Sequence, residues 1–148
     1  MNNIYTIGFT KKSAETFFEL LINNRIEVLL DVRLNNTSQL AGFSKYPDIE
    51  YFLKNICNIK YISDTTFAPE EWILKDYKNK KMSWEEYVEN FGELMEKRNI
   101  QEHILENYKE LANKRICLLC SEEKSDFCHR SLVAEYFKSV FGLQIINL

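Results

Sequence analysis

Two short runs of almost uninterrupted apolar residues, at 28–32 and 116–120, constrain the fold of this chain more than any other feature. A continuous apolar run is typical of a strand that is covered on both faces, as strands are in a parallel sheet. Shorter strand-like runs lie at 4–7, 59–62 and 144–146. Amphipathic helical patterns separate the runs, and strands that alternate with helices indicate right-handed βαβ units. We therefore predict one α/β domain over residues 1–148, with a Rossmann-like three-layer α/β/α architecture and a mainly parallel sheet of about five strands.

Composition narrows the class of protein before any motif is considered. The 148 residues are 45% hydrophobic, and a net charge of −3 argues against the uniformly basic surface that a duplex-binding protein would need. No apolar run approaches the roughly 18 residues of a membrane span, and the first residues lack a signal-peptide pattern. Four cysteines without a secretion signal point to a reducing compartment, where thiols are free, metal-bound or catalytic. We therefore expect a cytoplasmic protein with no membrane partner.

Capping signals and apolar spacing define the expected helices. Ser13 is suited to cap the first helix, and the spacing of Ser83 and Glu86 is that of a capping box. The helix that begins at Pro47 is expected to bury Tyr51, Phe52 and Ile56, with Leu53 as a further candidate for this face.

A long polar segment, 33–47, follows the second strand-like run and contains Asn, Ser and Gly. This composition is typical of a long loop with a functional role. We expect this loop and the helices between residues 69 and 111 to lie around one cleft as lids.

Polar residues directly follow four of the strand-like runs. In an open α/β sheet the carboxyl ends of the strands share one edge, where ligands bind at the point at which the strand order reverses. The residues that this rule brings together are Gly8, Thr10, Asp31, Arg33, Asp64, Cys120, Ser121 and Glu122. We therefore expect these residues to converge on one cleft.

The most specific local pattern is Cys120-Ser-Glu122, followed after five residues by Cys128-His129-Arg130. A thiol and a carboxylate leave the end of a buried strand, and a second thiol, an imidazole and a guanidinium follow at the start of a helix. A helix N-terminus and nearby cations lower the pKa of a cysteine, and they also favour a bound anion. We interpret Cys120, Glu122 and His129 as candidate catalytic residues, and Cys128 and Arg130 as candidates for binding an anion or substrate.

Asp31 and Arg33 place two opposite charges on one face at the end of a strand. A mutual ion pair is one interpretation. In the other, Arg33 clamps a phosphate or carboxylate, while Asp31 orients it or acts as a catalytic base. Three further residues are candidates for binding: Gly8, which permits close approach of chain or ligand, Thr10 at the sheet edge, and Ser38, whose loop offers hydroxyl and amide donors.

Metal ligation is an alternative use of the same groups. Cys120, Cys128, His129 and Glu122 include ligand types that zinc prefers. Their spacing is neither Cys-x-x-Cys nor His-x-x-x-His, and adjacent residues that are already helical would project in different directions. We therefore predict no cofactor and no metal, with zinc left as an open alternative.

The remaining thiols, imidazole and cationic helix end have simpler interpretations. Cys117 and Cys57 lie on apolar faces and are expected to be inert core thiols. His103 is expected to be a solvated surface residue, and Lys97-Arg98 an exposed helix end without a special role.

Taken together, these motifs resemble the domain-of-unknown-function family 488 over nearly the whole chain. The blocks that carry the resemblance are Thr6-Ile7-Gly8-Phe9-Thr10, Asp31-Val32-Arg33, Thr37 to Phe43, Ser83-Trp84-x-x-Tyr87, Leu118 to Glu122 and Cys128-His129-Arg130. Many members have His where Phe9 stands, and a Pro-containing loop where Asn35-Asn36 stand, so a role for that His is not carried over. The resemblance implies a compact α/β fold with a shared polar cleft, and no established reaction.

We hypothesise an enzyme that acts on a phosphate-bearing small molecule, a nucleotide or a nucleic-acid component. Arg33 and Arg130 would hold the anion, Cys120 would act as nucleophile or acid, and Glu122 with His129 would move protons. Two alternatives stay open: a non-catalytic domain that binds a nucleotide or nucleic acid, and a thiol redox or metal-holding protein that uses Cys120 and Cys128. The expected partner is a small-molecule anion or nucleotide, with nucleic acid as an alternative.

Overall fold

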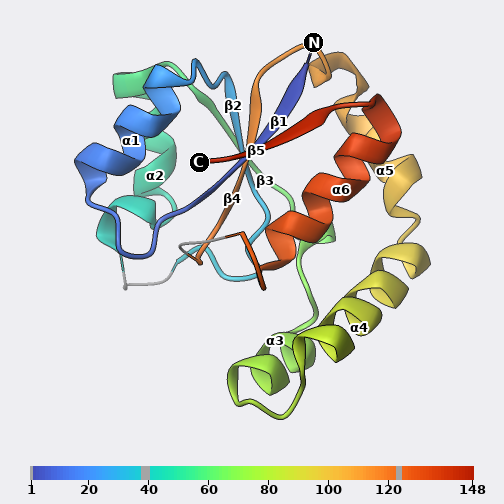
Figure 1. The fold of residues 1–148 in the computed structure, drawn as a ribbon. Helices are drawn as coiled ribbons and strands as arrows, with labels where there is room; N and C mark the ends of the chain where they lie inside the picture. Colours follow the sequence, from blue (N-terminus) through green and yellow to red (C-terminus); the bar gives the residue numbers. More distant parts are fainter. Residues whose placement is uncertain (1, 38–40, 123–124) are drawn as a thin grey trace.

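The computed structural model describes residues 2–37, 41–122 and 125–148, and a five-stranded sheet lies at its centre (Figure 1). The strands are β1 (Asn3–Gly8), β2 (Val28–Asp31), β3 (Lys60–Ser63), β4 (Ile116–Cys120) and β5 (Gln144–Asn147). All pairings are parallel, and the strand order is β3-β2-β4-β1-β5. The predicted Rossmann-like α/β/α architecture with a parallel sheet is therefore confirmed.

The register of the strands brings their carboxyl ends to one edge of the sheet. β4 lies between β1 and β2, with Gly8 opposite Cys120 and Asp31 opposite Leu119. β3 adds Ser63 opposite Asp31. The chain therefore leaves four strands at the same edge, and the segments that follow them can form one site.

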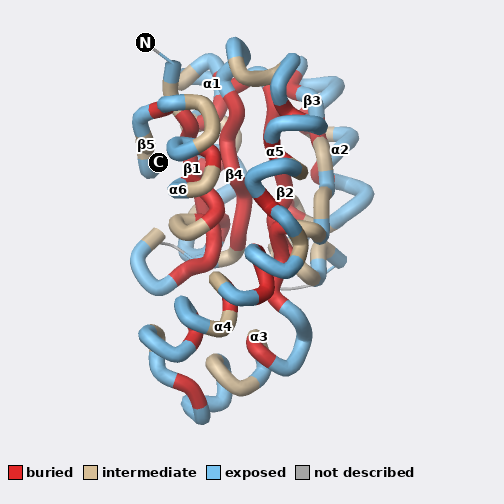
Figure 2. Tube along the Cα trace, turned by 90° about the vertical axis from the view of Figure 1, so that its right-hand side faces the viewer, coloured by how far each residue is buried: buried red, intermediate tan, exposed pale blue. Residues whose placement is uncertain are grey.

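The helices divide between the two faces of the sheet. α1 (Ala14–Asn23) and α2 (Asp48–Phe52) cover one face, and α5 (Ile100–Tyr108) and α6 (His129–Phe141) cover the other (Figure 1). α3 (Glu71–Lys78) and α4 (Trp84–Lys97) form an arm that extends beyond the carboxyl edge of the sheet (Figures 1 and 2). Among the described residues, no helix is both long enough and apolar enough to cross a membrane.

Each face of the sheet has its own hydrophobic cluster, and Figure 2 shows the strands as the buried centre. Side chains alternate along β4, so that Leu118 and Cys120 belong to the cluster under α6, whereas Cys117 and Leu119 belong to the cluster under α1. Full burial of one such aliphatic side chain stabilises the fold by about 1.5–3 kcal/mol. The continuous apolar runs thus encode strands that are covered on both faces. Cys117 is a buried core thiol, as predicted.

The predicted helix caps at Ser13 and Ser83 are confirmed. The Ser13 hydroxyl accepts a hydrogen bond from the Thr16 N–H at 3.1 Å. The Ser83 hydroxyl accepts from the Glu86 N–H at 3.1 Å, and the Glu86 carboxylate accepts from the Ser83 N–H at 3.4 Å, which completes the capping box. These bonds satisfy backbone donors that the first turn of a helix leaves unpaired.

The predicted buried face of the second helix is wrong for Tyr51 and Ile56, whereas the candidate Leu53 is buried. Tyr51 and Ile56 are 63% and 68% exposed, whereas Ile49 and Leu53 are fully buried. α2 continues as a π-helical segment over Leu53–Cys57. Ile49 and Leu53 lie four positions apart on one α-helical face, and Tyr51 lies off this face. The wider π-helical turn then changes the position of Ile56 around the helix axis relative to the α-helical spacing used for the prediction.

Asp64 and His103 bind each other, contrary to the predictions made for both residues. Asp64 follows β3, but its carboxylate lies 2.7 Å from His103 Nε2 and accepts a hydrogen bond from the Tyr108 hydroxyl, also at 2.7 Å. The His103 ring packs on Phe67 with 5.4 Å between the ring centroids. His103 is therefore part of the packing between β3 and α5, and Asp64 contributes to this packing instead of to the cleft.

The cationic end of α4 also has a structural role that the sequence did not predict. Arg98 Nη1 donates to the carbonyl oxygens of Thr66 at 2.9 Å and Ala68 at 2.7 Å. Arg98 therefore ties the end of the α3–α4 arm to the turn that follows β3.

Asp64→Asn should reduce stability at neutral pH by about 1–3 kcal/mol, because the hydrogen bonds to this group lose their charged acceptor. Burial by itself raises the pKa of Asp64, but hydrogen bonds from Tyr108, His103 and Thr66 outweigh it and lower the pKa. A carboxylate with a lowered pKa contributes stability above its unfolded-state pKa, and this contribution is lost as the pH falls through its folded-state pKa.

Denaturant unfolding between about pH 7 and about pH 3 measures this effect, since the unfolded-state pKa of Asp is about 3.9. The wild type should lose more stability over this range than Asp64→Asn. Glu106→Gln, at an exposed acid on the same helix, is the control and should change stability by less than about 0.5 kcal/mol. Equal pH dependence of the wild type and Asp64→Asn would contradict this account.

Candidate active site

A cleft of about 1190 Å³ lies at the carboxyl edge of the sheet. Its walls are the segments after β1 and β2, residues 41–43, the α3–α4 arm, and residues 120–122 and 126–129. Residues 33–35 and 41–43 of the predicted loop and the arm thus line the cleft, whereas α5 packs against α6 on the face of the sheet. This edge is where ligands bind in open α/β sheets.

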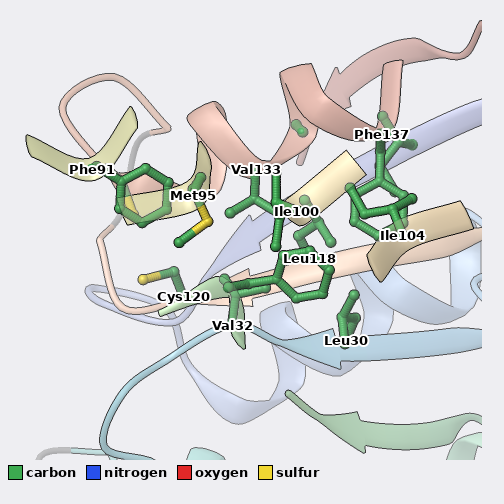
Figure 3. Packing of buried hydrophobic residues seen from close by; sticks show 14 of the residues in the cluster. Leu30, Val32, Phe91, Met95, Ile100, Ile104, Leu118, Cys120, Val133 and Phe137 are labelled. Atoms are coloured by element: carbon green, nitrogen blue, oxygen red, sulfur yellow. The ribbon is translucent and has the colours of Figure 1, made fainter. Parts of the chain in front are cut away.

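Cys120 and His129 form a thiol–imidazole pair in the cleft. Cys120 is the last residue of β4, and Figure 3 shows its sulfur at the end of the hydrophobic cluster, pointing away from Leu118. The sulfur lies 3.5 Å from His129 Nδ1, and His129 Nε2 lies 2.7 Å from the carbonyl oxygen of Val32. Because a carbonyl only accepts hydrogen bonds, Nε2 carries a proton, and the lone pair of the neutral ring is on Nδ1, facing the sulfur.

Cys128 supports a negative charge on Cys120. Hydrogen bonding from the Cys128 thiol is the largest influence on the pKa of Cys120, and it lowers that pKa. Burial raises the pKa, but the Ser121 N–H and the charge of Arg130 also lower it, so the net shift is downward. The same hydrogen bond, together with burial, raises the pKa of Cys128. Of the two sulfurs, Cys120 is therefore the one that loses its proton more readily.

Arg130 and Gly8 position the loop that carries these groups. Arg130 is 1% exposed, and its Nη1 donates to the Glu122 carbonyl oxygen at 2.6 Å and to the Cys128 sulfur at 3.6 Å. A Cβ atom at Gly8 would overlap the same Glu122 carbonyl and would lie 2.9 Å from Arg130 Nη1. The close approach predicted at Gly8 is therefore present, and the partner is the chain itself.

Arg33 and Asp31 form a buried, bidentate ion pair. Arg33 Nε and Nη2 donate to the two Asp31 oxygens at 2.9 and 2.7 Å. Nη2 also donates to the Ser44 carbonyl at 2.7 Å, and the Tyr61 hydroxyl donates to Asp31 at 2.6 Å. Burial lowers the pKa of Arg33, but hydrogen bonding and charge from Asp31 outweigh this effect and raise it. Arg33 is therefore a permanent buried cation in a fixed orientation.

The remaining guanidinium nitrogen of Arg33 is suited to bind a ligand. The guanidinium lies over the Phe9 ring, 5.3 Å from its centroid, and the residue lines the cleft. Nη1 is buried and has no hydrogen-bond partner among the described residues. Because a buried N–H donor without a partner costs about 1–3 kcal/mol, an anion in the cleft would gain from this contact.

Most of the predicted site residues fall into two groups in the structure. Those that line the cleft are Thr10, Arg33, Cys120, Glu122, Cys128 and His129. Gly8, Asp31 and Arg130 lie behind this lining and hold it in place, and Asp64 lies with His103. Thr10 also donates through its N–H and hydroxyl to the Ser121 carbonyl, at 3.0 and 2.6 Å. The predicted binding residue Ser38 lies outside the described residues.

Three contributors to the site were not found in the sequence. The Val32 carbonyl is backbone and has no sequence signal. Tyr61 lies in a predicted strand, and only the pairing of β3 with β2 shows that its hydroxyl reaches Asp31. Phe127 is 61% exposed and lines the cleft. Its sequence signal was an aromatic residue within a polar loop, which could have marked it as a contact for a ligand.

Fold and site together define a Rossmann-like α/β protein with a cysteine–histidine pair and a buried arginine at the carboxyl edge of its sheet. The chain belongs to the family described as "Domain of unknown function DUF488", whose model matches residues 13–137. The resemblance inferred from the motifs is therefore confirmed over α1 to most of α6. No curated protein and no solved structure gives a significant match to the chain.

Gly8→Ala should destabilise the protein by about 1–3 kcal/mol, because the added methyl group overlaps the Glu122 carbonyl, which is held by Arg130. Gly92→Ala in α4 is the matched control, since a Cβ atom there has no neighbour within 4 Å. The control should be neutral or stabilising by about 0.5–1 kcal/mol. Denaturant unfolding of both variants measures the difference, and equal stabilities would argue against the close approach.

Proposed function

We propose that this protein is an enzyme that uses the Cys120 thiol as a nucleophile on a phosphate-bearing small molecule, a nucleotide or a nucleic-acid component. The observation that carries the proposal is the line of three groups from Cys120 through His129 to the Val32 carbonyl. A nucleophile, a base within reach of its proton, and a third group that orients the base are the components of covalent catalysis by thiols.

His129 is the proposed general base and acid. Its Nδ1 takes the proton from Cys120, and the resulting imidazolium is stabilised by the hydrogen bond from Nε2 to Val32. The 3.5 Å separation is long for a hydrogen bond, but sulfur is a large atom and such contacts tighten when substrate binds. The thiolate also benefits from the positive end of the α6 dipole.

Arg33 is the proposed anion-binding residue. Its Nη1 would donate to a phosphate oxygen in the cleft, while Asp31 holds the guanidinium through the other side. Asp31 is fully buried with both oxygens hydrogen-bonded, so we assign it a positioning role instead of a proton-transfer role. Glu122 lines the cleft and is a second candidate for moving protons.

The proposed reaction has two steps. In the first, the Cys120 sulfur forms a bond to the electrophilic phosphorus or carbon, the bond to the leaving oxygen breaks, and that oxygen takes the proton from His129. In the second, His129 removes a proton from water, the water oxygen attacks the same centre, and the sulfur leaves and recovers its proton. No oxidant or reductant is needed.

A thiol redox protein is the second candidate, and it rests on the proximity of Cys120 and Cys128, whose sulfur atoms lie within 4.8 Å of each other. This candidate does not use Arg33 or the large cleft. The enzyme proposal accounts for both, and we prefer it for that reason.

Cys120 should react with iodoacetamide at least about tenfold faster than Cys117 in the native protein, because thiolate character controls the rate. Burial raises the pKa of Cys117, and that residue lies on the opposite face of β4, so it serves as an internal control. Mass spectrometry of digested protein gives the rate for each cysteine. Inorganic phosphate should slow the reaction at Cys120 but not at Cys57, which lies outside the cleft.

Two variants separate the contributions to this reactivity. His129→Gln should slow alkylation of Cys120, and Arg33→Lys should abolish protection by phosphate, since a lysine cannot form the bidentate pair with Asp31. Equal rates at Cys120 and Cys117, with no effect of phosphate, would rule out the proposed site.

Cys120→Ser should retain ligand binding but lose turnover by roughly 10³-fold or more, because only the covalent step requires the thiol. A thermal-shift screen with nucleotides and phosphorylated metabolites would first identify a ligand, since a ligand that binds the folded state raises the melting temperature. Mass spectrometry would then test for conversion of the ligand and for an adduct on Cys120. A ligand that binds but remains unchanged, with no adduct, would favour a non-catalytic binding domain.

A further inference from the structure

Three potential metal ligands meet at the base of the cleft. The sulfur atoms of Cys120 and Cys128 and a ring nitrogen of His129 all lie within 4.8 Å of one another, and the three residues are buried. Among the described residues, this is the one group of three or more His, Cys, Asp or Glu side chains with such geometry. Two thiolates and an imidazole form a ligand set that zinc and related soft divalent cations prefer.

We propose that Cys120, Cys128 and His129 bind one soft divalent metal ion, with Zn²⁺ the expected ion, and leave its fourth position open to the cleft. Nothing in the proposed reaction requires this ion, so the inference goes beyond the proposed function. All three residues line the cleft, and three protein ligands with one open position are typical of exchangeable and catalytic zinc sites rather than closed structural ones.

The separation of Cys120 and His129 fits this proposal quantitatively. A tetrahedral zinc ion with a sulfur ligand at about 2.3 Å and a nitrogen ligand at about 2.05 Å places these two atoms about 3.6 Å apart. The distance between Cys120 Sγ and His129 Nδ1 is 3.5 Å. Two ligands of one ion would therefore need almost no change in this separation.

The surrounding contacts also match a metal site. The other ring nitrogen of a metal-bound histidine usually donates to a carbonyl or carboxylate, and His129 Nε2 lies 2.7 Å from the Val32 carbonyl oxygen. This bond leaves Nδ1, the atom that faces Cys120, as the ligand. Arg130 Nη1 donates to the Cys128 sulfur at 3.6 Å, a supporting contact of the kind that orients a metal ligand.

The backbone at Cys128 removes the objection that the sequence raised against a metal. Cys128 is the N-cap residue of α6 with φ −124° and ψ 138°, an extended conformation, and His129 is the first helical residue. Their side chains therefore do not diverge as two neighbouring helical residues would. Cys120, at the end of β4, lies within 4.8 Å of both, so the unusual spacing in the sequence is compatible with one ligand set.

A bound ion would also regulate the proposed enzyme. It would occupy the Cys120 sulfur and the His129 Nδ1 lone pair together, so metal-bound protein could not start the thiol reaction. Only this consequence rests on the proposed function; the metal site itself does not.

Titration of the reduced, metal-free full chain with Co²⁺ tests the proposal, because tetrahedral cobalt with thiolate ligands has intense visible and sulfur-to-metal charge-transfer absorption. We expect one Co²⁺ per chain and its displacement by one Zn²⁺ with a Kd below about 1 µM. Cys128→Ser should weaken Zn²⁺ binding by at least about tenfold, since loss of a supporting partner alone costs roughly 10–100-fold. Cys57→Ser, outside the cleft, is the matched control and should bind like the wild type.

A second measurement uses the unmodified protein, in case Cys128→Ser does not fold. One equivalent of Zn²⁺ should protect Cys120 and Cys128 from alkylation, and should leave Cys57 as reactive as before. Absence of binding tighter than about 1 µM, binding that Cys128→Ser weakens less than about tenfold, or protection of neither sulfur would overturn the metal site. Cys128→Ser keeps both members of the Cys120–His129 pair, so phosphate-sensitive alkylation in this variant would uphold the proposed function even if the metal proposal failed.

Discussion

The parallel pairing of β4 with β1 on one side and β2 on the other is the constraint on which the rest of the structure depends. It aligns Gly8 and Cys120 in one register and places Asp31 beside Leu119. The loop after β4 can then pass over Gly8, and Arg33 can reach the same cleft as Cys120. Without this register, the thiol, the imidazole and the guanidinium would lie on separate parts of the surface.

Burial of charge is the main energetic cost of this arrangement. Arg33 is 3% exposed and Asp31 is fully buried, so the ion pair loses most of its hydration. Such a pair adds little to stability when its Coulomb energy is balanced against the loss of hydration. Its bidentate geometry and the bonds from Tyr61 and to Ser44 nevertheless fix the direction of the guanidinium. The pair therefore contributes orientation more than stability.

The sequence predicted the parallel sheet, the caps at Ser13 and Ser83, and six of the residues that line the cleft, because these features depend on local periodicity and on the edge rule for parallel sheets. It failed where long-range partners decide a role. His103 was assigned to solvent because its partner, Asp64, lies 39 positions away. Tyr51 and Ile56 were wrongly placed on the buried face of this helix, because Ile49 and Leu53 define that face and a π-helical segment changes the spacing after Phe52. The orientation of His129 depends on a backbone carbonyl, which no side-chain pattern encodes.

Cys120 belongs to the hydrophobic cluster under α6 and to the lining of the cleft at the same time (Figure 3). Its neighbours in that cluster include Phe91 and Met95 from the α3–α4 arm, so the packing that holds the arm also surrounds the thiol. Close-packed interiors transmit small changes in volume to adjacent side chains. Folding stability and thiol reactivity therefore cannot be tuned independently in this chain: sequence variation that repacks the arm also alters the environment of the sulfur.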